Sequence, residues 1–273
     1  MKKIYLVNNY SGVHVDGLKN SIYDLKKYYE AHIIEEREIE EPVDDKLKNI
    51  NRVLDINTRT FEYANTLIKS SYIPVMVGGD HSIAIATVAA TANNYDNVGL
   101  IWIDAHADIN THETTPSGNI HGMPIAAMLG ICDERLNKIG GDFVKIKPEN
   151  VVYLGLRSVD EGEVELLEKL KIKSYYYSEI QEKGLENVLN EVSNYLNVSN
   201  IHLSFDLDSM NPELIPGVST PVDGGFNYDE VCKIFDFFSD NYEIKSYDFV
   251  EYNKKYDVEN QTLSTLIKLI ERI

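Results

Sequence analysis

Short apolar runs alternate with amphipathic stretches along most of the chain. Eight runs have the length and composition of strands, and several are apolar at every position. They cover residues 3–8, 32–36, 73–77, 98–104, 150–156, 172–177, 201–206 and 244–251. Seven amphipathic stretches predict helices between and after them, at residues 19–30, 45–70, 83–93, 162–171, 185–197, 228–238 and 257–273.

Strand–helix alternation of this kind predicts a parallel sheet with helices on both faces. Strands that are apolar throughout support this, because parallel strands are usually covered on both sides. No internal repeat, low-complexity tract or Pro/Gly-rich linker interrupts the 273 residues. We therefore expect one domain, residues 1–273, of the α/β class, with three α/β/α layers and a central, mostly parallel eight-stranded sheet.

Composition and charge exclude several classes of partner. The formal net charge of −18 argues against nucleic acid and against an anionic membrane surface. It is compatible with a cationic substrate, although acidic surfaces also simply keep proteins soluble. No run of 18 apolar residues predicts a transmembrane helix, and the N-terminal segment is typical of a first strand rather than a signal peptide. Cys132 and Cys232 form no Cys-x-x-Cys pair, and the absence of a disulfide framework favours a cytoplasmic location.

Three segments at predicted strand ends carry residue types that bind metals. They are Gly-Gly-Asp-His after residues 73–77, Asp-x-His-x-Asp after residues 98–103, and Asp-x-Asp at the end of residues 201–206. Each motif alone has an ordinary explanation: a tight turn with a helix N-cap, a solvated loop, or turn chemistry. Parallel sheets bind ligands at the carboxyl ends of their strands, so the three motifs together favour one metal site. The candidate ligands are His81, Asp104, His106, Asp108, Asp206 and Asp208.

Four carboxylates and two imidazoles are more than one divalent ion needs, which predicts a two-metal site. Asp104 and Asp206 each come first in their motif and are natural bridging ligands. The other candidates would complete the two shells, with one imidazole per metal. Oxygen-rich ligation without thiolates favours Mn²⁺ over Zn²⁺.

A polar loop lies between the carboxylate motifs. Residues 114–124 contain Ser117, Asn119 and His121, and Gly118 and Gly122 predict unusual backbone angles. The loop suits a polar small molecule, but a turn-rich connection explains its composition equally well. We expect the remaining histidines to lie at the surface or in loops (His14, His32 and His112) or to be packed inside a strand (His202).

Taken together, these motifs resemble the ureohydrolase family, and within it the arginases. The matching segments are residues 78–82, 104–110, 117–124, 204–208 and 216–225 (Pro-Gly-Val-Ser-Thr-Pro-Val-Asp-Gly-Gly), followed by Val250-Glu251-Tyr-Asn253. The resemblance extends from about residue 73 to the C-terminus. It implies a centre of two Mn²⁺ per subunit and hydrolysis of L-arginine to L-ornithine and urea, in which a metal-bridging hydroxide attacks the guanidinium carbon.

The resemblance also assigns roles to single residues. Asp108 would pass a proton to the departing amine, His121 would shuttle protons to bulk water, and Glu251 would pair with the guanidinium group. One metal ion would be held by His81, Asp104, Asp108 and Asp206. The other would be held by Asp104, His106, Asp206 and Asp208.

Substrate recognition is assigned to a further set. By resemblance, Asn110, Ser117 and Asn119 belong to the loop that contacts the α-carboxylate, Asp160 reads the α-amino group, and Thr220 completes the set. Agmatine lacks the carboxylate and would leave these polar groups unpaired, which favours arginase over agmatinase. The alternatives are a ureohydrolase for agmatine or another guanidino compound, and a protein that binds manganese and arginine without turnover.

Two departures from the family pattern concern the surroundings of the metal site and the assembly. The family usually continues Gly-x-Asp-Pro after the second carboxylate pair, whereas this chain has Ser209-Met-Asn211-Pro. Such a change alters hydrogen bonds around metal ligands. The family implies a homotrimer or homohexamer, but Asp229-Glu230 stands where many arginases carry an Arg-Glu pair that helps subunit contact, so the oligomeric state is left open.

Overall fold

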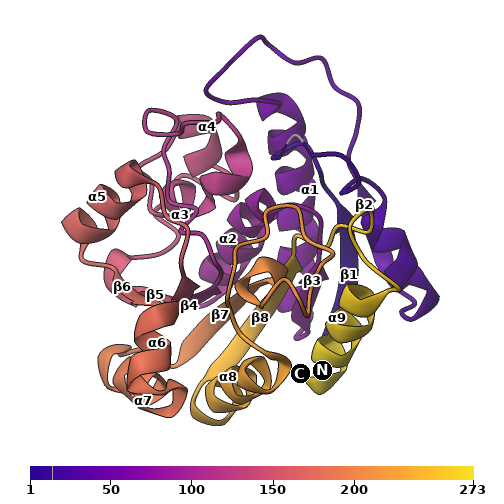
Figure 1. Ribbon diagram of the computed structural model, residues 1–273. Helices are drawn as coiled ribbons and strands as arrows, with labels where there is room; N and C mark the ends of the chain where they lie inside the picture. Colours follow the sequence, from indigo (N-terminus) through magenta and orange to yellow (C-terminus); the bar gives the residue numbers. More distant parts are fainter. Residues whose placement is uncertain (14) are drawn as a thin grey trace.

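The protein is built around a single eight-stranded sheet (Figure 1). A computed structural model describes residues 1–13 and 15–273, so the expectation for His14 lies outside the described residues. The strands are β1 (Lys2–Asn8), β2 (His32–Glu35), β3 (Ile73–Val77), β4 (Gly99–Ile103), β5 (Val151–Leu156), β6 (Lys173–Tyr176), β7 (Asn200–Asp206) and β8 (Glu243–Val250). Their order is β2-β1-β3-β8-β7-β4-β5-β6, and every neighbouring pair is parallel. All eight predicted strands are confirmed, and the sheet is parallel throughout rather than mostly parallel.

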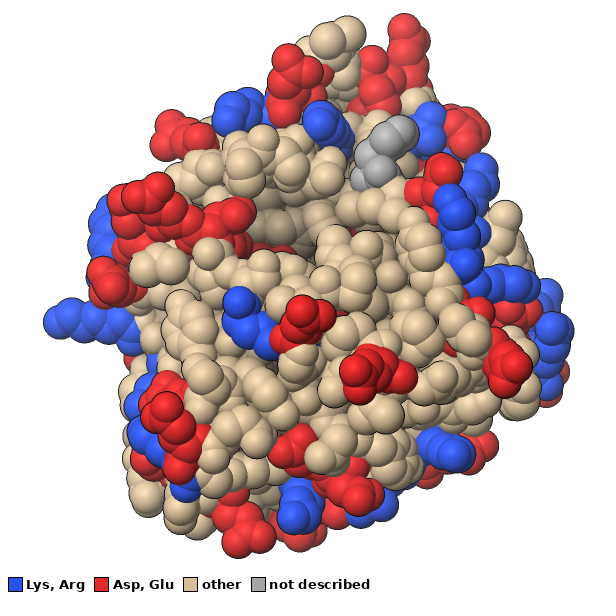
Figure 2. All heavy atoms as spheres, viewed as in Figure 1, with Lys and Arg blue, Asp and Glu red and all other residues tan. Residues whose placement is uncertain are grey.

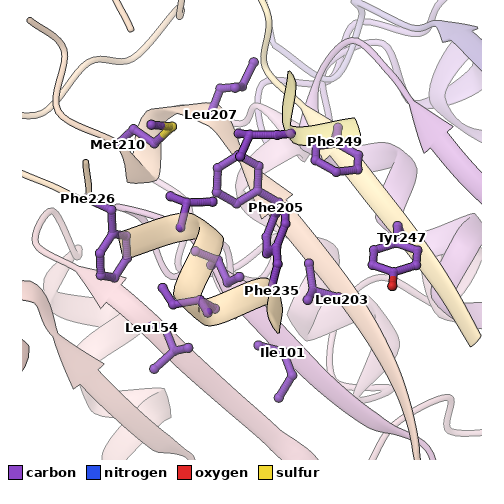
Figure 3. Packing of buried hydrophobic residues seen from close by; sticks show 14 of the residues in the cluster. Ile101, Leu154, Leu203, Phe205, Leu207, Met210, Phe226, Phe235, Tyr247 and Phe249 are labelled. Atoms are coloured by element: carbon purple, nitrogen blue, oxygen red, sulfur yellow. The ribbon is translucent and has the colours of Figure 1, made fainter. Parts of the chain in front are cut away.

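The central strands are buried on both faces, which explains their continuous apolar sequences. All residues of β4 are buried, and alternate side chains point to opposite layers. Ile101 and Ile103 pack in one core cluster, whereas Leu100 and Trp102 pack in another. Figure 3 shows the first of these clusters, in which the rings of Phe205, Phe235 and Phe249 lie close together.

Helices cover both faces of the sheet. The α-helices are α1 (Ile50–Lys69), α2 (Ala84–Asn94), α3 (Pro124–Met128), α4 (Glu134–Asn137), α5 (Glu161–Leu170), α6 (Tyr177–Lys183), α7 (Leu185–Tyr195), α8 (Tyr228–Asn241) and α9 (Gln261–Arg272). Residues of α7, α8 and α9 pack in one core cluster, and residues of α1–α5 pack in the other two. The three-layer architecture is therefore confirmed.

The predicted helices are correct with one exception. Residues 19–30 form no α-helix but a 3₁₀ helix, η1 (Ser21–Lys27). Its buried apolar residues, Ile22 and Leu25, are three positions apart, which suits the three residues per turn of a 3₁₀ helix. The short helices α3, α4 and α6 were not predicted, because four to seven residues give too little periodicity to recognise.

The strand order brings separate parts of the sequence together at the centre of the sheet. Strands β7 and β8, late in the chain, lie between β3 and β4. The four carboxyl ends of β3, β8, β7 and β4 are therefore neighbours. Segments that are more than a hundred residues apart in sequence can build one site there.

Two further observations concern the surface and the thiols. None of the helices in residues 1–13 and 15–273 is long and apolar enough to span a membrane. Both cysteines, Cys132 and Cys232, are free and buried.

Candidate metal centre and substrate cleft

His81 is held rigidly at the end of β3. The side chain of Asp80 accepts a hydrogen bond from Ser82 N at 3.0 Å and caps the turn that carries the histidine. The His81 ring is stacked on Trp102 of β4, with centroids 3.8 Å apart, and its Nε2 lies 2.9 Å from Ser204 Oγ. These contacts direct the other ring nitrogen, Nδ1, toward the ends of β4 and β7.

Three carboxylates surround that nitrogen. His81 Nδ1 lies 3.0 Å from Asp104 Oδ2, 3.1 Å from Asp206 Oδ2 and 3.3 Å from Asp108 Oδ2. The ring and all three carboxylates are buried. The structure thus gathers these four predicted ligands around one position.

A second group lies beside the first. His106 Nδ1 lies 3.1 Å from Asp208 Oδ2 and 3.5 Å from Asp104 Oδ1. Asp104 therefore offers one oxygen to each group, which is the geometry expected of a bridging carboxylate. Asp206 offers Oδ2 to the first group, while its Oδ1 accepts a hydrogen bond from Asp208 N at 2.8 Å.

The residues present fit divalent cations. His81 Nδ1 and Asp104 Oδ2 are buried, and although they lie 3.0 Å apart they form no hydrogen bond with each other or with another described group, so both are free to act as ligands. Within residues 1–13 and 15–273, the four candidate aspartates form ion pairs with histidines only and none with Lys or Arg. Burial raises the pKa of Asp108 to about 6, with the charge of Asp104 adding to the effect, and burial likewise raises the pKa of Asp206. Buried carboxylates of this kind are stabilised in the charged form by bound cations.

Two site residues have unusual backbone angles. Asp108 has φ of 50° and Glu251 has φ of 66°, a region that non-glycine residues seldom occupy. Hydrogen bonds hold both segments: Ile109 N donates to Glu163 Oε1 at 3.1 Å, and Glu251 N donates to Gly79 O at 2.8 Å. The surrounding structure imposes these angles, as is common at functional sites.

A cleft of about 140 Å³ opens above the two groups. All the predicted substrate-binding residues line it: Asn110, Ser117, Asn119, Asp160, Thr220 and Glu251. The face drawn in Figure 2 is hollowed near its middle, and Asp and Glu side chains lie along the edge of the hollow. The cleft is also lined by Thr115 and Ser158, two hydroxyl residues that sequence reasoning did not single out.

The predicted substrate-binding residues form hydrogen bonds with each other and with a candidate metal ligand. Asn110 Nδ2 donates to Asp160 Oδ2 at 2.9 Å, which links the predicted carboxylate and amino contacts of the substrate. Thr220 Oγ1 donates to Asp208 Oδ2 at 3.0 Å, so this residue also supports a predicted metal ligand. Asn119 N donates to Ser117 Oγ at 3.1 Å and thereby shapes the loop between them.

That loop packs against the segment that precedes α1. Lys48 N donates to Gly118 O at 3.0 Å, and Lys46 Nζ donates to Thr115 O at 3.0 Å. Gly118 has φ of 75°, and a Cβ atom there would lie 1.9 Å from Asp45 O, so only glycine allows the contact. The unusual angle expected at Gly118 is confirmed. The one expected at Gly122 is wrong, since that residue is not among the glycines with positive φ.

His121 and Glu251 form a pair at the wall of the cleft. His121 Nδ1 lies 3.3 Å from Glu251 Oε1. Burial lowers the pKa of His121, but the hydrogen bond and charge of Glu251, together with the charges of Asp108 and Asp80, outweigh burial and raise the pKa to about 9. Glu251 Oε2 is buried and has no hydrogen-bond partner, so this oxygen is free to bind a cationic group.

A buried polar network lies behind His81 and was not predicted. Ser204 Oγ donates to Asp248 Oδ2 at 3.4 Å, and His202 Nε2 lies 2.8 Å from the same oxygen. His202 is packed inside the protein, as expected. His202 and Ser204 alternate with apolar residues along β7, which was a signal for this network. Their shared partner on β8, Asp248, is more than 40 residues away in sequence.

Comparison with known proteins identifies the family. A family model described as "Arginase: Arginase family" matches residues 15–273. The chain belongs to the arginase family. An arginase of Bacillus subtilis (strain 168) is 46% identical over 84% of this chain and 78% of its own length.

Solved structures agree with this assignment. The arginase of Bacillus caldovelox has a TM-score of 0.87 at 36% identity, covering 100% of this chain and 98% of that one. An Entamoeba histolytica arginase in complex with L-ornithine has a TM-score of 0.89 at 28% identity, covering 100% and 99%. The resemblance seen in the motifs is confirmed, and the chain is a hydrolase of the arginase family with the fold of those enzymes.

Proposed function

We propose that this arginase-family hydrolase converts L-arginine to L-ornithine and urea with two Mn²⁺ per subunit. The observation that carries the proposal is the pair of His/Asp groups joined by Asp104 at the floor of the cleft. When bound, two such cations lower the pKa of water and supply a nucleophile for hydrolysis near neutral pH. The proposed ligands are His81, Asp104, His106, Asp108, Asp206 and Asp208. The proposed location is the cytoplasm.

Three residues of the cleft would bind the guanidinium group and move protons. Glu251 Oε2, buried and without a partner, would accept hydrogen bonds from the guanidinium nitrogens. Asp108 lies in the first His/Asp group and lines the cleft, so its carboxylate would pass a proton to the departing amine. The His121 side chain is 19% exposed, so it can exchange protons between the cleft and solvent.

Other residues that line the cleft would bind the amino-acid end of the substrate. Asn110, Ser117 and Asn119 present amide and hydroxyl groups for an α-carboxylate, and Asp160 presents a carboxylate for an α-amino group. The complex of the Entamoeba histolytica arginase with L-ornithine supports an amino-acid ligand for this fold. A substrate without the carboxylate would leave polar groups unpaired, which costs affinity.

The first test is urea release from L-arginine and from agmatine by metal-stripped protein, before and after addition of Mn²⁺. We expect turnover of L-arginine only with Mn²⁺, and a kcat/KM for agmatine that is at least about a hundredfold lower. Activity on agmatine alone would overturn the roles of Asn110, Ser117 and Asp160. Tight binding of Mn²⁺ and L-arginine without urea release would show a protein that binds its ligands without turnover.

Asp248 provides a second prediction, because it orients Ser204 and through it His81. Asp248→Asn removes the charged acceptor while keeping the shape of the side chain. The affinity for Mn²⁺ should fall by about 10–100-fold at the position next to His81, as is typical when a partner of a ligating histidine is lost. Calorimetric titration of metal-stripped protein measures the loss.

The control for this variant is Ser246→Ala. Ser246 Oγ lies 2.5 Å from His202 Nδ1 and belongs to the same buried network, but it has no hydrogen bond to Ser204 or His81. Its loss should leave Mn²⁺ affinity within about threefold of the wild-type value. Equal losses of affinity in the two variants would mean that the network stabilises the core and does not orient His81.

A further inference from the structure

The side chain of Arg157 lies at the centre of a ring of backbone carbonyl groups beside the cleft. Its Nη2 donates to Asp208 O at 2.6 Å, the shortest of its hydrogen bonds. The other acceptors are the carbonyl oxygens of Gly155, Ser209, Met210, Val222 and Asp223, at 3.1–3.3 Å. A guanidinium group has five N–H donors in one plane and can satisfy such a ring, whereas an ammonium group cannot.

The surroundings of Arg157 are built to receive this group. Gly225 has φ of 106°, and a Cβ atom there would lie 2.6 Å from Arg157 Nη2 and 2.6 Å from Ser209 O. The guanidinium carbon lies 5.9 Å from the centroid of the Tyr177 ring. Among the described residues Arg157 has no carboxylate partner. All the hydrogen bonds of its side chain go to backbone carbonyl oxygens.

The backbone of Arg157 is anchored to the other metal-ligand segment. Arg157 N donates to Ala105 O at 2.9 Å, and Ala105 stands between Asp104 and His106. One residue therefore touches both segments of the second group, through its amide at Ala105 and through its side chain at Asp208. No equivalent contact joins Arg157 to His81 or Asp108 in the described structure.

The same side chain fixes the loop that supports Asp208. It binds residues 208–210 after β7 and residues 222–223 before α8. Thr220, two residues before Val222, donates to Asp208 Oδ2. Arg157 thus holds both the backbone of Asp208 and the loop that orients its carboxylate.

We propose that Arg157 is a positioning residue that sets the separation of His106 and Asp208 and so tunes the cation position that they form with Asp104. The proposal rests on the two-metal function above. Loss of the side chain would leave the backbone hydrogen bond to Ala105 O intact and remove the hydrogen bond to Asp208 O. Affinity should fall at the His106/Asp208 position and stay unchanged at the His81/Asp108 position.

The experiment is a titration of metal-stripped full-length protein with Mn²⁺, followed by calorimetry and by electron paramagnetic resonance. The variants are Arg157→Ala and Arg157→Lys. Arg59→Ala is the control, because Arg59 is also partly buried, pairs with Asp55 and donates to the carbonyl of Glu35 far from the cleft. Wild type and control should bind two ions, with the signal of a coupled pair.

In both Arg157 variants the first ion should bind within about twofold of the wild-type affinity. The second should bind about 10–100-fold more weakly, so that the signal of isolated Mn²⁺ dominates at one equivalent or more. Guanidinium chloride at millimolar concentration should restore the second affinity of Arg157→Ala, because the free ion fills the ring of carbonyls, and should leave wild type unchanged.

Three outcomes would overturn the inference: two unchanged affinities, equal loss at both positions, or no rescue by guanidinium. If Arg157→Ala does not fold, the two Mn²⁺ affinities of Arg157→Lys decide by the first two of these criteria. Failure of the proposed function has a different signature, because wild-type protein would then either bind fewer than two ions or bind both without releasing urea from L-arginine.

Discussion

Asp206→Asn is expected to lower urea release from L-arginine by more than about a thousandfold, because loss of one essential member of a catalytic unit costs nearly as much as loss of the whole. Asp206 is buried, lies 3.1 Å from His81 Nδ1 and accepts a hydrogen bond from Asp208 N. An amide can keep the second contact through its oxygen. It offers no negative charge to a cation and cannot bridge two of them. At least one of the two Mn²⁺ should be absent from the purified variant.

The measurement is a metal count by mass spectrometry together with urea release at saturating Mn²⁺. Asp236→Asn makes the same chemical change at an exposed ion pair with Arg272 and should retain two ions and full activity. Near-normal activity of Asp206→Asn with both ions bound would remove this residue from the proposed ligand set. Thermal unfolding of the metal-free proteins separates loss of metal from loss of fold.

The fold was predictable because its central strands are apolar at almost every position. In β4 and β5 every residue is buried, so the sequence contains no polar interruption that could hide the strand. The order of the strands was not predictable from periodicity. The insertion of β7 and β8 between β3 and β4 depends on contacts between residues more than a hundred positions apart. The 3₁₀ helix at Ser21–Lys27 was mistaken for an α-helix because both forms bury residues three positions apart.

The candidate ligands were predictable because they stand directly after strands. Position alone placed His81, Asp104 and Asp206 at one edge of the sheet, and the structure brings their side chains within hydrogen-bond distance. The roles of Glu251 and His121 came from the family resemblance, since a single Glu or His does not identify its own function. Their pairing at 3.3 Å depends on the tertiary fold.

The residues that support the ligands were missed for a physical reason. Arg157 binds carbonyl groups, which every residue carries, so no side-chain pattern marks its partners. Asp248 is an acidic residue inside a buried strand, and only its hydrogen-bond partners, Thr87 and His202, explain its place there. Sequence motifs therefore indicate which residues can hold the ions. The contacts that set the affinities become visible only in three dimensions.

His121→Ala is expected to separate proton transfer from metal binding. The His121 side chain forms its hydrogen bond with Glu251 Oε1 and none with a carboxylate of the two His/Asp groups. The variant should therefore keep both Mn²⁺ ions and bind L-arginine with a KM within about threefold of the wild-type value, while kcat falls about 10²–10⁴-fold, the usual contribution of a positioned acid or base. Initial rates over a range of L-arginine concentrations, with a metal count on the same sample, provide the measurement.

His32→Ala is the matched control, because His32 is exposed at the start of β2 and stacks on Tyr63 away from the cleft. It should leave kcat and KM unchanged. Loss of an ion from His121→Ala, or a raised KM with normal kcat, would contradict the proton-transfer role. In the first case His121 would support the metal centre through Glu251, which also accepts a hydrogen bond from His81 N at 3.0 Å. In the second case it would bind substrate, and proton exchange with solvent would have to proceed through another group at the cleft.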